Sequence, residues 1–231
     1  MNEPKNKKMI ISEKKTKTMI INFSRNYQFM TRLILNNTNI EVVDKIKILG
    51  TIITDKLDWD ENCNSIIQKV NKRMLLLKKI LSFGATNEEM VHLWIIYCRS
   101  LLEQSAVVWA SSLTQENIND LERTQKSFVK LILKHEFKTE HEKSYENALL
   151  KLNLQTLEQR RKELCLNFSK NGVSHDKLKD LFPEKQKLHS MNTRHSEKYE
   201  VLFANTERMK KSSIIYMQNL LNSNEQVSNK T

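Results

Sequence analysis

The stretch EEMVHLWIIYCRSLLEQSAVVW, residues 88–109, predicts a long helix at the centre of the fold. It follows a Thr86-x-x-Glu89 capping box and contains neither Gly nor Pro. Its apolar residues leave almost no polar face, a pattern typical of a helix buried among others. Charged residues within it exclude a membrane span. Two of these, Arg99 and Glu103, are spaced to form an ion pair on one face of the helix.

Composition favours long helices and an anionic partner. The chain has 231 residues with only 3 Gly and 2 Pro, so few tight turns are expected. Its net charge of +11 is typical of proteins that bind nucleic acid. A basic surface without any partner has the same composition, and charge alone does not separate the two.

The three cysteines, Cys63, Cys98 and Cys165, are far apart and show no zinc-ligand spacing. We expect reduced thiols, with Cys98 and Cys165 in core faces, and therefore an intracellular protein, nuclear or cytoplasmic. The sequence shows no signal-peptide pattern and no run of 18 apolar residues, so we expect no membrane association.

The first part of the chain is predicted to be a small β unit. Residues 18–23 form a β-prone run, and the tetrad 36–39 (NNTN) separates two apolar runs as the turn of a hairpin does. Residues 46–54 (IKILGTIIT) predict a further strand with a bend at Gly50. Such a unit is too small to bury a core and is expected to belong to a larger sheet.

Helical periodicity begins at Asp60. Residues 60–81, 88–109 and 115–134 predict three helices with short connections, and hence an antiparallel bundle with the apolar helix in the middle. We expect further helices over 145–152, 156–170 and 214–221, with Asn171-Gly172 ending the second of them. The segment 184–212 is predicted to be loose and the tail after 222 to be disordered.

Two basic stripes are candidate phosphate-binding surfaces. One combines Lys69, Lys72 and Lys79 with the adjoining Arg73 on the first helix. The other combines Arg123, Lys126, Lys130 and Lys134 opposite the apolar stripe of the third helix. Cations on one helix face bind phosphates without reading sequence. A solvated helix face shows the same pattern, so both interpretations stay open at this point.

Catalytic motifs are missing from the sequence. It contains no Asp-Asp pair, P-loop, GxSxG, HExxH or GxGxxG. Acidic residues gather around Trp59, but at a predicted helix start, where the helix dipole favours negative charge. We therefore predict no metal site and regard an independent enzyme as poorly supported.

Several motifs, in order and over roughly residues 12–221, resemble the region that follows the palm active site in reverse transcriptases of jockey-like non-LTR retrotransposons. They include VDKIKILG and LDW at residues 43–59, YCRSLLE at 97–103, VW at 108–109 and LERTQK at 121–126. Later segments, Y-x-x-AL at 145–149 and L-x-x-RR-x-x-LC at 157–165, follow in the family's order.

The resemblance implies a division of the chain. Residues 1–57 would be a palm remnant with primer-grip-like strands, and 58–136 a thumb-like helical bundle. Residues 137–222 would be a C-terminal helical extension that includes the loose segment, and 223–231 a disordered tail. The fold expected is therefore mainly α with a small β-hairpin unit at its start. Lys15 matches the family's lysine just after the catalytic carboxylates.

The resemblance also implies a function. We expect a C-terminal fragment of an RNA-directed DNA polymerase that grips the RNA or DNA template–primer duplex through its backbone. The family's metal-binding carboxylates lie upstream of Lys15, so this chain alone is expected to be inactive, and Mg²⁺ is expected only for a complete polymerase. The partners expected are the duplex and the palm and fingers. The alternative is a non-catalytic helical interaction module with a solvated basic face.

Overall fold

The computed structural model describes residues 11–24, 33–133, 142–184 and 199–228. The chain divides into two compact units, Met1–Asn62 and Cys63–Thr231. The described part is mainly helical, and its strands all lie in the first unit. The expectation of a mainly α protein with a small β unit at its start is confirmed. No described helix is both long enough and apolar enough to cross a membrane.

The described strands of the first unit form three separate two-stranded ladders. β1 (Lys17–Thr18) pairs in parallel with β4 (Glu41–Val42). The other two ladders are antiparallel. They join β2 (Ile34–Leu35) to β3 (Thr38–Asn39), and β5 (Lys45–Ile48) to β6 (Thr51–Thr54).

The turns of the two hairpins need residues with positive φ. Asn36 and Asn37, with φ of 48° and 65°, connect β2 to β3, so the predicted turn is confirmed, although the second strand is shorter and earlier than expected. The single strand predicted over 46–54 is wrong, because the chain reverses at Leu49 and Gly50, whose φ angles are 47° and 92°. A two-residue hairpin turn with positive φ at both residues strongly prefers glycine at its second position, which Gly50 occupies.

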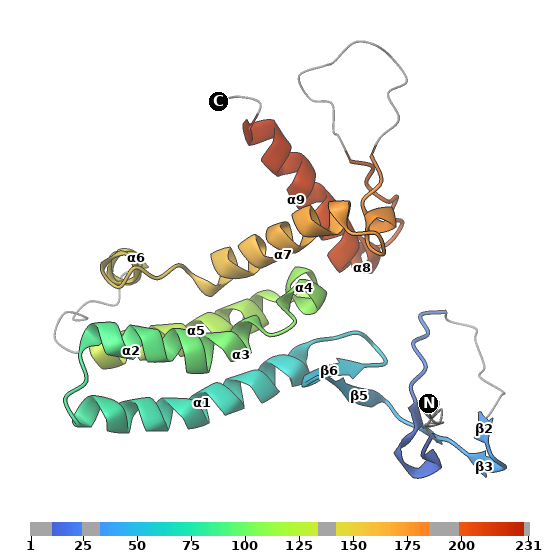
Figure 1. Ribbon diagram of the computed structural model, residues 1–231, viewed down its shortest axis with the longest axis horizontal. Helices are drawn as coiled ribbons and strands as arrows, with labels where there is room; N and C mark the ends of the chain where they lie inside the picture. Colours follow the sequence, from blue (N-terminus) through green and yellow to red (C-terminus); the bar gives the residue numbers. More distant parts are fainter. Residues whose placement is uncertain (1–10, 25–32, 134–141, 185–198, 229–231) are drawn as a thin grey trace, which may run out of the picture. The chain divides into compact units, whose positions relative to one another are not determined.

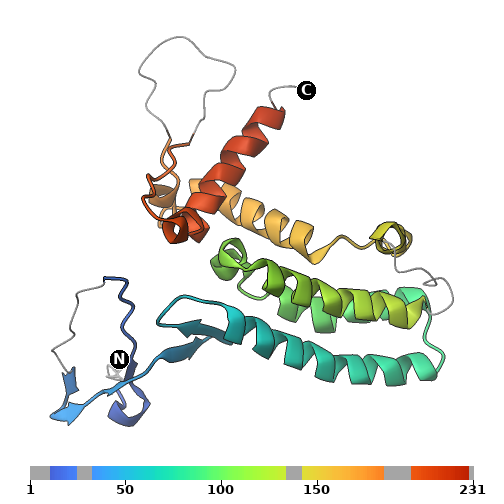
Figure 2. The ribbon, with the colours of Figure 1, turned by 180° about the vertical axis from the view of Figure 1, so that it is seen from behind.

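Helices of the second unit lie in layers. α1 (Asp60–Ser82), which starts in the first unit, runs along one side. α2 (Asn87–Leu93), the π-helix η2 (Trp94–Arg99), α3 (Ser100–Glu103) and α5 (Gln115–Ile132) form the middle, and α7 (Leu157–Ser174) lies on the other side (Figures 1 and 2). The predicted bundle and extension thus belong to one unit, since α7 contacts α3, α4 (Ala106–Trp109) and α5.

The segment 88–109 is not one continuous α-helix. Every fourth residue is buried, and a four-residue repeat would rotate around a helix of about 3.6 residues per turn. The π-helical turns of η2, with more residues per turn, offset this rotation. The buried repeat comprises Met90, Trp94, Cys98, Leu102 and Ala106. The helix then ends at Gln104, because Ser105 adopts a left-handed conformation with φ of 54°.

A stacked aromatic pair lies at the centre of the middle layer. The rings of Trp94 on η2 and Phe128 on α5 lie 4.5 Å apart and nearly parallel, and both are fully buried. Trp109 is buried as well, and its indole N–H donates to the Gln104 carbonyl at 3.0 Å. Trp94 and Trp109 are thus core residues, as expected for the apolar stretch 88–109, and Phe128 belongs to the apolar face of α5.

The C-terminal part is more ordered than the sequence predicts. α6 (Glu142–Lys151) and α8 (Glu207–Lys210) are short, but α9 (Ser213–Ser228) continues six residues beyond Asn222, where the tail was expected to be disordered. Within α9, the buried Asn222 side chain anchors the helix, because it accepts the N–H of Tyr199 and donates to the carbonyl of Tyr199. Residues 185–198 of the predicted loose segment and 229–231 of the tail lie outside the described part.

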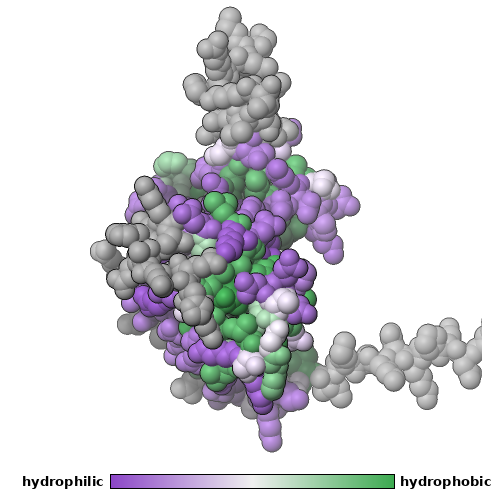
Figure 3. All heavy atoms as spheres, turned by 90° about the vertical axis from the view of Figure 1, so that its left-hand side faces the viewer, coloured by the Kyte–Doolittle hydropathy of each residue, from purple (hydrophilic) through white to green (hydrophobic). Residues whose placement is uncertain are grey.

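α6 covers one end of the helical unit. It packs Tyr145, Ala148 and Leu149 inward and leaves Leu150 exposed. From this end, hydrophobic atoms form a band between hydrophilic ones (Figure 3).

α7 also runs past its predicted end at Gly172. A Cβ on Gly172 would lie 2.7 Å from Cε2 of Phe182, so the glycine permits close packing rather than helix termination. Phe182 is buried in a cluster with Cys165, Tyr199 and Met217, and its ring has little room to move.

We expect Gly172→Ala to lower the free energy of unfolding by about 1–3 kcal/mol through overpacking against Phe182, which outweighs a gain in helix propensity of at most about 1 kcal/mol. Urea denaturation measures the change. The control is Asn171→Ala at the exposed preceding position, which should not destabilise. A higher urea midpoint for Gly172→Ala would contradict the packing argument.

Candidate nucleic-acid interface

The predicted cations of α1 lie on one flank of that helix. Lys72 and Lys79 are exposed and Lys69 is half-buried, and none of the three forms an ion pair with a described residue. Arg73 lies at the seam between α1 and η2, where its Nη1 donates a hydrogen bond to the carbonyl of Tyr97. The α1 stripe therefore presents positive charge that the described part of the chain does not neutralise.

Cations of the α5 stripe form contacts with other side chains of the same chain. Arg123 pairs with Asp120 at 2.7 Å, one turn away on α5. The Lys126 ammonium lies 5.0 Å from the ring centroid of Tyr145, within cation–π distance. Lys130 is exposed. Lys134 lies outside the described residues.

Lys15 lies in the short 3-10 helix η1 (Glu13–Lys15) of the first unit and is exposed. The assignment of Lys15 and of the two stripes to nucleic-acid binding remains a prediction.

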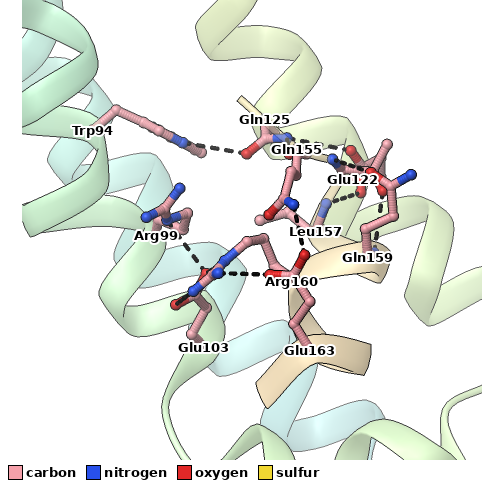
Figure 4. A network of polar contacts seen from close by, with 11 residues as sticks. Trp94, Arg99, Glu103, Glu122, Gln125, Gln155, Leu157, Gln159, Arg160 and Glu163 are labelled. Carbon is pink, nitrogen blue, oxygen red and sulfur yellow. Dashed lines mark hydrogen bonds and ion pairs between the residues drawn. The ribbon is translucent and has the colours of Figure 1, made fainter. Parts of the chain in front are cut away.

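Behind the stripes, a buried polar network joins the helices (Figure 4). The Glu122 carboxylate on α5 accepts the hydroxyl of Tyr145 at 2.5 Å and the N–H of Leu157, the first residue of α7, at 2.9 Å. Gln125, one turn further along α5, donates to the Gln155 carbonyl at 2.8 Å and to the Tyr145 hydroxyl at 3.2 Å. Two side chains of α5 thus position both α6 and the start of α7.

Gln125 also links this network to the aromatic pair. Its side-chain oxygen accepts the indole N–H of Trp94 at 3.4 Å, and the residue is fully buried. In the sequence, Gln125 stands among the apolar residues of the third predicted helix, Leu121, Phe128 and Ile132, at helical spacing. A lone amide in an otherwise apolar stripe indicates buried hydrogen bonding, and this signal was available in the sequence.

The start of α7 is fixed by its capping residues. Thr156 accepts the N–H of Gln159 at 3.2 Å, and the Gln159 side chain accepts the N–H of Thr156 at 3.3 Å, so the two residues form a capping box. With Glu122 accepting the N–H of Leu157, three of the donors at this helix start have partners.

An ionic group lies on the other side of α7 from Glu122. Glu103 at the end of α3 pairs with Arg99 at 3.3 Å, as predicted, and with Arg160 of α7 at 3.0 Å. Arg160 also pairs with Glu163 at 2.9 Å. Hydrogen bonding to Glu103 raises the pKa of Arg160, so this guanidinium remains charged and holds α7 against α3.

Arg161 points away from this group. It is 4% exposed, and neither of its terminal nitrogens has a hydrogen-bond partner within the described residues. Burial lowers its pKa, and the carboxylates of Glu122 and Glu158 act in the opposite direction. The two adjacent arginines of α7 thus differ, because Arg160 has carboxylate partners and the terminal nitrogens of the buried Arg161 have none among the described residues.

Acidic residues next to Trp59 form the first turn of α1. Asp60 and Glu61 lie in its first turn, as the dipole argument predicted, and Glu61 pairs with Lys45 of β5 at 3.0 Å. Over the described ranges, no three His, Cys, Asp or Glu side chains form a group able to hold a metal ion.

The three cysteines are free and buried. Burial raises the pKa of both Cys98 and Cys165 to about 11. Because the thiolate is the reactive form, neither is suited to act as a nucleophile at neutral pH.

A comparison of the chain with protein-family models, curated proteins and solved structures finds no match.

We expect Glu122→Gln to lower the free energy of unfolding by about 1–3 kcal/mol, because an amide cannot accept hydrogen bonds at both ends and one buried donor loses its partner. Glu146→Gln, at an exposed position of α6, should stay within about 0.5 kcal/mol of the wild type. Combining Glu122→Gln with Tyr145→Phe should cost less than the sum of the single changes. Strictly additive costs would show that the two side chains do not interact.

The raised thiol pKa values predict slow alkylation in the folded protein. Iodoacetamide at pH 8 should modify Cys98 and Cys165 many times more slowly in the native protein than in urea, since both burial and protonation oppose the reaction. Mass spectrometry over time measures each site. Rapid modification of either thiol in the native protein would contradict its placement in the core.

Proposed function

We propose that this chain is the post-palm part of an RNA-directed DNA polymerase of the jockey-like, non-LTR retrotransposon type. In this proposal the helical unit is a thumb-like bundle that grips the sugar–phosphate backbone of a template–primer duplex. The strands of the first unit are a remnant of the polymerase palm. The remaining palm and the fingers are the protein partner of this chain. The function proposed is thus binding and positioning of nucleic acid.

One observation supports the proposal above the others. Residues of separate motifs that carry the resemblance contact one another in the fold. Arg99 and Glu103 of one motif meet Arg160 of another, and Glu122 of a third motif meets Tyr145 of a fourth. Motif residues scattered over more than sixty positions therefore act as one set that orients the helices.

The chemistry of polymerisation requires groups other than those described. Two Mg²⁺ ions held by carboxylates stabilise the attacking and leaving oxygens in such reactions. The printed sequence has no adjacent Asp-Asp pair to hold them. We propose that these carboxylates belong to the palm and fingers, and that Lys15 lies near the palm site.

The alternative function, a helical interaction module with a solvated basic face, has one observation in its favour. Two described cations of the α5 stripe already have intramolecular partners. Arg123 forms an ion pair with Asp120, and Lys126 lies over the ring of Tyr145. However, surface pairs of this kind contribute little to stability and exchange readily for phosphate contacts. The two functions are therefore separated by binding measurements on variants.

Replacing Arg123, Lys126 and Lys130 together by Ala should weaken binding to an RNA–DNA duplex and reduce its salt dependence. Each lost phosphate contact lowers the slope of log K against log salt by about 0.9 for a B-form duplex, so three contacts lower it by roughly 2.7. Fluorescence anisotropy at several salt concentrations measures the slope.

The matched control for this triple variant replaces Lys162, Lys170 and Lys177, which are exposed on or just after α7, by Ala. It removes the same charge from a different surface and should leave the slope close to that of the wild type. An equal loss in both triple variants would indicate that only net charge matters. An affinity unchanged by the α5 substitutions would exclude this stripe from the interface.

A further inference from the structure

The π-helix η2 leaves two large apolar side chains on the surface. Trp94 and Cys98 are fully buried, but Ile96 is 64% exposed and Tyr97 is 48% exposed. The sequence predicted both to be buried in a helix that is apolar all round. π-helical turns within helices frequently occur at functional sites. The exposed ring therefore needs an explanation beyond packing.

Arg73 connects this surface to the cations of α1. Its guanidinium donates to the Tyr97 carbonyl, so α1 and η2 adjoin at this point. Lys69 and Leu76 lie one helical turn before and after Arg73, on the same flank of α1. Leu76 is exposed. We call this surface the Tyr97 face, and it comprises Lys69, Lys72, Arg73, Leu76, Ile96 and Tyr97.

The positive charge of the Tyr97 face favours a nucleic-acid strand over an apolar protein helix as its partner. Lys69 and Lys72 form no ion pair with any described residue, and Arg73 is bonded to a neutral carbonyl. An apolar helix of another protein would cover Ile96 and Tyr97 but leave these cations without countercharges. A nucleic-acid strand satisfies both features, because its phosphates bind the cations and its bases stack on an aromatic ring.

The α5 stripe lacks such a ring. The aromatic residue beside it, Tyr145, is buried and donates its hydroxyl to Glu122. Burial raises the pKa of Tyr145, and the Glu122 carboxylate raises it further, so this ring remains a neutral part of the core. Of the two basic stripes, only that of α1 adjoins a solvent-exposed aromatic side chain in the described part of the chain.

We propose that the Tyr97 face binds single-stranded nucleic acid, with one base stacked on the Tyr97 ring and the flanking phosphates on Lys69 and Lys72. This inference rests on the proposed function and deepens it, because it adds a contact to unpaired bases to the contacts with a duplex backbone. Stacking is tolerant of sequence, since every base has a π face. The site therefore distinguishes strands that have free bases from strands that do not.

The test compares two strands of equal charge. Fluorescence anisotropy with the full chain follows binding of a pyrimidine oligonucleotide of about a dozen residues, as DNA and as RNA, and of an abasic sugar–phosphate strand of the same length. The wild type should bind the base-bearing strands about tenfold more tightly than the abasic strand. Tyr97→Leu, which keeps an apolar side chain without a π face, should abolish this preference, and Tyr97→Phe should retain it.

Two lysines of α1 supply a matched pair of controls. Lys72→Ala should weaken binding of the base-bearing and abasic strands by the same factor, because it removes a phosphate contact. Lys78 is exposed on the opposite flank of α1, so Lys78→Ala should leave the binding of both strands close to that of the wild type.

The outcomes separate this inference from the proposed function. Salt-dependent duplex binding without any preference for base-bearing strands would overturn the role of Tyr97 and leave the proposed function standing. Absence of binding to every nucleic acid would overturn both. Binding of an acidic amphipathic peptide, abolished by Tyr97→Leu and without oligonucleotide binding, would identify a protein-binding face and would also overturn both.

Discussion

The carboxylate of Glu122 joins three helices. Its own backbone belongs to α5, and its two oxygens accept the Tyr145 hydroxyl from α6 and the first N–H of α7. A half-buried acceptor with two partners orients both, because losing it would leave the hydroxyl of Tyr145 and the N–H of Leu157, both on buried residues, without this acceptor. Gln125, one turn along α5, extends the same joint to Trp94 and the middle layer. The positions of α6 and α7 on α5 depend on this joint.

Glu103 complements this joint one turn further along α7. It pairs with Arg99 of η2 and with Arg160 of α7, so the first turn of α7 is held by Glu122 at Leu157 and by Glu103 at Arg160. The cations of α1 and α5 lie outside this internal frame, and several of them are exposed. We propose that the motifs resembling those of reverse transcriptases form this internal frame, and that the basic faces which it positions provide the function.

Sequence patterns predicted the elements governed by local rules. The capping residue Thr156 and the turn at Asn36-Asn37 lie where local chemistry places them, because each depends on a few neighbouring residues. The prediction failed where a distant residue decides the local structure. Gly172 continues α7 because Phe182 packs against it, and η2 becomes a π-helix because the buried repeat has four residues. The candidate cations were identifiable in the sequence, but the exposure of Tyr97 beside Arg73 was not.

The central claim is that the folded chain grips the backbone of a template–primer duplex. Its most direct test is the binding of the unmodified chain to a short RNA–DNA duplex at increasing salt, followed by fluorescence anisotropy. The account predicts saturable binding at low salt and a linear decrease of log K with log salt, as phosphate contacts release counterions. No binding at low salt, from a chain shown by circular dichroism to be folded and helical, would contradict it.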